Sequence, residues 1–143
     1  MALIGLLVSV RENGGEPVIG LFALVMTGLT GCSLVEPTAD INVQTPVALT
    51  RKKALDCAIT TINQIAKTQA HWKISPLKVD PNLGVLETGN FDEINVLGIR
   101  ARLIYQPNER RFLGKIKASG IYYSDLGADK AALDLGNGLS KCQ

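Results

Sequence analysis

Two neighbouring segments in which apolar and polar residues alternate constrain the fold of this chain most. They are EINVLGIRARLIY, residues 93–105, and FLGKIKASGIYY, residues 112–123, and the turn QPNERR joins them. Alternation with a period of two is typical of strands that bury one face against a core. The two segments therefore predict an antiparallel strand pair.

The side chains also predict how these two strands pair. A loop over residues 106–111 places Tyr105 opposite Phe112. It also places Leu103 opposite Gly114, Ala101 opposite Ile116 and Ile99 opposite Ala118, so that large residues meet small ones along this face. A slip of one residue would expose the apolar set, which makes this register the expected one. The expected inward residues of the first strand are Leu97, Ile99, Ala101, Leu103 and Tyr105.

Two other segments have the three- and four-residue apolar spacing of helices. The first extends from Thr50, a suitable N-cap, to about Trp72, and it is apolar on one side only. The second begins near Ala128. The GNG at 136–138 either ends this second helix or allows close packing.

The remaining segments complete the predicted domain. Short strands are expected at 73–75 and 84–87. The fold class is therefore α+β: a small antiparallel sheet of three or four strands, covered by an N-terminal amphipathic helix and a C-terminal helix. We expect this domain to occupy residues 50–143. Residues 32–49 contain Pro37 and Pro46 and predict a tether, with an edge strand over INVQT as the alternative.

The first 31 residues have the character of a signal peptide. The chain of 143 residues is 46% hydrophobic, and this stretch contains only Arg11, Glu12 and Glu16 as charged residues. Its second apolar run, residues 18–31, has the length of a signal-peptide core and is too short to span a bilayer. The run ends in LTGC, residues 29–32. This motif resembles the lipobox of bacterial lipoproteins.

The lipobox resemblance implies that residues 1–31 are removed and that Cys32 becomes a lipid-modified N-terminus carrying acyl chains such as palmitate. Ser33, rather than aspartate, follows the cysteine. By resemblance to Gram-negative lipoproteins, this implies the outer membrane, with the domain in the periplasm. Two features depart from the family: acidic residues accompany Arg11, and an extra apolar stretch precedes it. The alternative is a buried or membrane helix that ends in LTGC by chance.

The chain has three cysteines, so a lipid on Cys32 would leave Cys57 and Cys142 as a pair. In an exported protein these two residues would meet an oxidising compartment, and we expect a disulfide between them. Two buried free thiols are the alternative.

The predicted register crowds four positive charges on the outer face of the strand pair. Arg100 falls opposite Lys117, and Arg102 falls opposite Lys115. Because like charges that face each other are unfavourable, this basic ladder predicts a surface that binds an acidic partner segment, an anionic lipid headgroup or a cell-wall polymer. The alternative is a solvated face whose long side chains extend into water.

No residue pattern predicts catalysis, a metal or a cofactor. His71 is the only histidine, so neither a zinc cluster nor a second imidazole is available. The GNG lacks the preceding strand and the following lysine of a phosphate-binding loop. The formal net charge of +2 is mild, and no nucleic-acid-binding motif accompanies it.

The sequence therefore favours a non-enzymatic envelope lipoprotein that acts as an accessory or assembly factor of a larger outer-membrane complex. In size, anchor and layout it resembles secretin pilotins. The first alternative is a structural subunit of a homo-oligomeric ring or disc, assembled through exposed sheet edges. The second alternative is a cell-wall enzyme.

Overall fold

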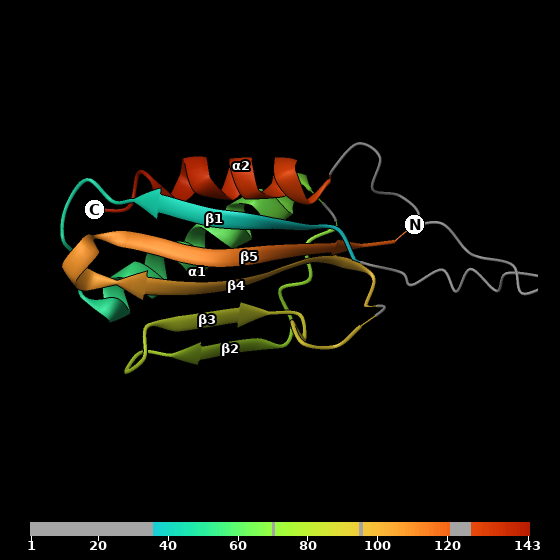
Figure 1. Ribbon diagram of the computed structural model, residues 1–143, viewed down its shortest axis with the longest axis horizontal. Coiled ribbons are helices and arrows are strands. Elements are labelled where there is room, and N and C mark those ends of the chain that lie inside the picture. The colour runs from blue at the N-terminus through green and yellow to red at the C-terminus, as the bar shows by residue number, and fades with distance from the viewer. Residues whose placement is uncertain (1–35, 70, 95, 121–126) are drawn as a thin grey trace, which may run out of the picture. The chain divides into compact units, whose positions relative to one another are not determined.

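A computed structural model describes residues 36–143 except 70, 95 and 121–126, and all of these lie in one structural unit, Ser33–Gln143. The described part of the chain forms one antiparallel sheet and two α-helices (Figure 1). The order along the chain is β1 (Thr38–Gln44), α1 (Arg51–Thr68), β2 (Leu77–Asp80), β3 (Val85–Thr88), β4 (Gly98–Gln106), the 3-10 turn η1 (Pro107–Glu109), β5 (Arg111–Ser119) and α2 (Ala128–Leu139).

In the described residues the sheet has five strands in the order β1-β5-β4-β3-β2. The predicted α+β class is confirmed, but the expected count of three or four strands is wrong. The fifth strand is β1, within the segment predicted as a tether, and it precedes the helix that we expected to come first. For Thr38–Gln44 the edge-strand alternative is the correct one, because these residues pair antiparallel with β5 along their whole length.

The central strand pair has the predicted register. Tyr105 lies opposite Phe112, and Ala101 lies opposite Ile116. Leu97 is the exception, since it is 61% exposed although the alternation predicts it to face inward. The strand begins only at Gly98, whose φ of +116° turns the chain and breaks the alternation before it.

The small hairpin of β2 and β3 lies partly where the sequence predicted it. β3 overlaps the expected segment 84–87, but 73–75 is not a strand. Instead, Trp72 forms an isolated bridge with Ile99, and β2 begins later, at Leu77. The chain thus reaches the sheet edge a few residues after the predicted position.

Both helices lie on one face of the sheet, and the core fills the space between the two layers (Figure 1). α1 begins as predicted, with Thr50 Oγ1 accepting from Lys53 N–H at 3.3 Å, but it ends at Thr68 rather than near Trp72. The fully buried residues of the core come from α1, α2, β3, β4 and β5 and include Leu55, Ile62, Leu86, Ile99, Leu103, Tyr105, Phe112, Ile116, Leu135 and Leu139.

The GNG segment lies inside α2, so it does not end the helix. A Cβ on Gly138 would come within 2.2 Å of Thr61 Cγ2 on α1. Glycine at this position therefore allows the two helices to approach closely, which was the second alternative from the sequence.

Candidate functional site

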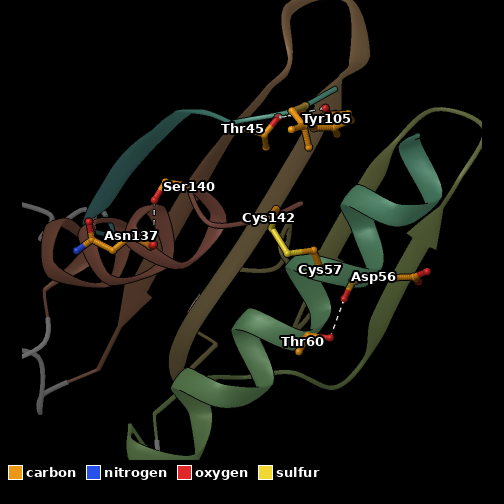
Figure 2. Close-up of a disulfide and its surroundings, with 9 residues drawn as sticks. Thr45, Asp56, Cys57, Thr60, Tyr105, Asn137, Ser140 and Cys142 are labelled. Carbon is orange, nitrogen blue, oxygen red and sulfur yellow. Dashed lines mark hydrogen bonds between the residues drawn. A yellow bond between two sulfur atoms is a disulfide. The ribbon is translucent and has the colours of Figure 1, made fainter. Parts of the chain in front are cut away.

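Cys57 and Cys142 form a disulfide, as predicted. The Sγ atoms are 1.98 Å apart and the Cα atoms 5.9 Å apart, although 85 positions separate the residues in sequence. Figure 2 shows that the bond joins α1 to the chain just beyond α2. The C-terminal segment is thereby fastened to the helical layer. Cys32 and the rest of the LTGC motif lie outside the described residues.

The four cations of the basic ladder lie in the predicted register, with Arg100 opposite Lys117 and Arg102 opposite Lys115. The expectation that all four face solvent is wrong for Arg100, whose side chain is fully buried. It donates to Glu36 Oε1 at 2.5 Å and to the Glu93 carbonyl oxygen at 2.6 Å.

The burial of Arg100 has a clear cause. The β3–β4 connection, which contains Glu93, and the residues before β1, which contain Glu36, both fold over this end of the outer sheet face. Alternation in a strand specifies which face a side chain joins, but it carries no information about segments that later cover that face. Arg100 is therefore a structural ion-pair residue in this protein.

Glu36 lies at one rung of the ladder, where its carboxylate contacts both Arg100 and Lys117. Its Oε2 is 3.8 Å from Lys117 Nζ, and its Oε1 accepts from Ser119 Oγ at 2.6 Å as well as from Arg100. Burial raises the pKa of Glu36, but the hydrogen bonds from Ser119 and Arg100 and the charges of Arg100 and Lys117 together outweigh it, so the pKa is lowered below its ordinary value. The carboxylate thus stays ionised and compensates the charges of Arg100 and Lys117.

The sequence analysis did not identify Glu36. One available signal was the edge-strand alternative for INVQT. The β1–β5 register pairs Thr38 with Lys117, and continuing it by two residues sets Glu36 against Ser119. Had that strand been preferred over the tether, the carboxylate would have been expected beside the ladder.

The remaining two cations also have acidic partners within this chain. Arg102 Nε donates to Glu87 Oε1 at 2.6 Å, and Arg102 also pairs with Asp92. Lys115 Nζ donates to Asp40 Oδ1 at 2.8 Å. The repulsion that would favour an external acidic partner is therefore relieved by groups within the chain, and partner binding by the ladder stays a prediction.

Phe91 is the second residue that the sequence analysis missed. Its ring is buried against the outer face, with its centroid 4.6 Å from Arg102 Cζ and 4.8 Å from Lys117 Nζ. Lys117 also donates to the Phe91 carbonyl oxygen at 2.9 Å. These cation–π contacts hold the aromatic ring between two rungs and give the outer face an apolar centre.

Beside Phe91 the outer face is hollowed by a cavity of about 340 Å³. Its lining is Asp40, Phe91, Arg102, Ile104, Leu113, Gly114 and Lys115. Phe91, Ile104 and Leu113 give the cavity an apolar lining, and its charged groups already form ion pairs with one another or with neighbours. Such a surface can bind an apolar side chain, but its lining contains no cysteine, serine or histidine that would act as a nucleophile or base.

Within the described ranges, no group of three or more His, Cys, Asp or Glu residues is placed to hold a metal ion. Among the helices described, none is long and apolar enough to cross a membrane. Comparison of the chain with models of protein families, with curated proteins and with solved structures finds no significant match.

Proposed function

We propose that this protein is a non-enzymatic lipoprotein of the bacterial outer membrane that serves as an accessory or assembly factor for a larger envelope complex. The observation that carries the proposal is the disulfide between Cys57 and Cys142 in a chain whose third cysteine ends an LTGC motif. Structural disulfides are typical of exported proteins, and the motif accounts for the remaining cysteine.

The position of β1 refines the proposal. Five residues, 33–37, separate Cys32 from Thr38, and this length of chain spans at most about 20 Å. A lipid on Cys32 therefore holds the sheet close to the membrane surface, in place of the longer stand-off expected for a tether over 32–49. The factor would act on a partner where that partner meets the bilayer.

The anchor is tested by mass spectrometry of the protein isolated from membranes. The expected N-terminal peptide begins at Cys32 and carries acyl chains, and Cys32→Ser is expected to release the protein or leave it as precursor. Cys142→Ser is the matched control, because it replaces a cysteine outside the motif and should leave the anchor intact. An unmodified Cys32 within an uncut chain contradicts the proposal.

The accessory role is tested separately by crosslinking in the native membrane and by deletion of the gene. We expect one larger envelope protein to be captured, and we expect that protein to lose its assembly or location in the deletion strain. Capture of copies of this chain alone, in a large symmetric oligomer, would favour the structural-subunit alternative.

A further inference from the structure

Among the described residues, no strand pairs with the outer edge of β1, and the main-chain groups along this edge are unpaired there. Thr45 N–H donates to the Arg110 carbonyl at 2.7 Å, and Ala118 N–H donates to the Pro37 carbonyl at 2.9 Å. Main-chain groups in an antiparallel pair alternate between the two sides of a strand. The odd-numbered residues of β1 therefore face β5, and the opposite set points its N–H and C=O groups away from the sheet: Thr38, Asp40, Asn42 and Gln44.

A groove of about 560 Å³ follows this edge. β1 lines it from Ala39 to Gln44. The facing residues are Asp129, Ala132, Leu133, Gly136 and Asn137 on one side of α2, and Ser140 just after the helix. Figure 1 shows α2 running beside β1 in the same direction. Leu133 is 63% exposed and contributes an apolar surface. Gly136 instead allows α2 to approach β1, because a Cβ there would lie 3.2 Å from Val43 Cγ2.

We propose that this groove binds an extended segment of a partner protein by strand addition to β1. The added strand would bond to the four outward-facing residues of β1, and its alternate side chains would lie against α2. Main-chain hydrogen bonds supply affinity in this mode of recognition, and contacts with alternate side chains supply specificity. The inference rests on the proposed function only in taking the segment to belong to an envelope protein.

Charge and shape define the segment. The groove lining contains two carboxylates and no lysine or arginine. Because Asp40 already pairs with Lys115, Asp129 is the carboxylate left to attract a basic residue. Asp129 lies in the first turn of α2, so the fitting segment runs parallel to β1, with a basic residue at its N-terminal end and small apolar residues beside Leu133. A second copy of this chain fits less well, because its own α2 accompanies its β1 and would meet the first α2 on the same face of the sheet.

The test uses protein purified from membranes in detergent and the probe acetyl-Lys-Thr-Val-Thr-Ala-Thr-Val-Thr-amide. Two analogues carry N-methyl groups on either the odd or the even positions of the probe. We expect one analogue to bind about tenfold more weakly and the other to bind like the parent, because only one set of N–H groups faces β1. Equal binding by both analogues would overturn the proposal.

Amide hydrogen exchange locates the added strand. On binding, the amides of Asp40, Asn42 and Gln44 should become protected, whereas those of Ile41 and Val43 should change little because they already face β5. Protection of the same three amides without the probe, accompanied by self-association, would assign the edge to a second copy and refute a partner segment.

Two variants complete the design. Asn42→Pro removes one outward N–H and should weaken binding about tenfold, while Asn42→Ala keeps that N–H and should bind normally. Asp129→Lys alters an exposed residue, so the fold should survive, and it should weaken binding of the lysine-bearing probe. Normal binding by Asp129→Lys would refute the charge argument. Because the probe assay does not require the lipid, binding by unlipidated protein would preserve this inference while the proposed anchor failed.

Discussion

Replacing Arg100 with methionine should destabilise the protein by about 3 kcal/mol. The Arg100 side chain is fully buried, and its loss leaves Glu36 as a buried carboxylate without its closest cation. Breaking one partner of a buried ion pair generally costs about 3–5 kcal/mol. The lower end applies here because Glu36 keeps the Ser119 hydrogen bond at 2.6 Å and Lys117 at 3.8 Å. Against a typical total stability of about 5–15 kcal/mol, this is a large loss.

Arg102→Met is the matched control on the same strand. The Arg102 side chain is 32% exposed, and pairs of this kind contribute at most about 1 kcal/mol. Urea unfolding can be followed by the fluorescence of Trp72, which is buried and is the only tryptophan. With a slope of about 1.5 kcal/mol/M, the Arg100→Met midpoint should fall by about 2 M, and the Arg102→Met midpoint by well under 1 M.

A double variant tests the reasoning itself. If the loss in Arg100→Met arises from the stranded carboxylate, adding Glu36→Met should recover part of the stability, because an apolar pair needs no compensation. Equal losses of stability in Arg100→Met and Arg102→Met, with no recovery in the double variant, would show that Arg100 is solvated and that the β3–β4 connection does not bury it.

Cys142→Ser should lower the free energy of unfolding by up to about 4–5 kcal/mol in the chain-entropy model, given the 85-residue separation of the two cysteines. Wild type in reductant should show the same loss. If Cys142→Ser were as stable as oxidised wild type, no disulfide would form. Gly138→Val should cost about 1–3 kcal/mol in thermal unfolding because its Cβ would overlap Thr61, whereas Gly127→Ala, with open space around the added Cβ, should change little. Because the pKa of Glu36 is lowered in the folded state, its contribution to the free energy of unfolding is fully present above its unfolded pKa of about 4.5 and is lost as pH falls through its lower folded pKa. Glu36→Gln should therefore flatten the dependence of stability on pH in this range. Identical pH dependence in Glu36→Gln and wild type would contradict a lowered pKa for Glu36.

The elements that were predicted correctly depend on short-range patterns. The helix N-cap at Thr50, the start of α2 at Ala128 and the register of Ala101 against Ile116 all follow from residues within a few turns or within one hairpin. Periodicity is a local property of the chain, so it identifies each buried face without knowledge of the remaining structure. The disulfide was predicted by counting cysteines, conditional on the lipobox resemblance, and the lipid anchor still rests on that resemblance.

The features that only the tertiary structure decided join distant parts of the chain. Arg100 and Glu36 are 64 positions apart, and β1 reaches β5 across most of the domain. An edge strand is half exposed and flanked here by prolines, so its own residues resemble a tether as much as a strand. A side chain that alternation assigns to the outer face becomes buried when another segment covers it, and that covering depends on long-range packing, which local periodicity does not specify.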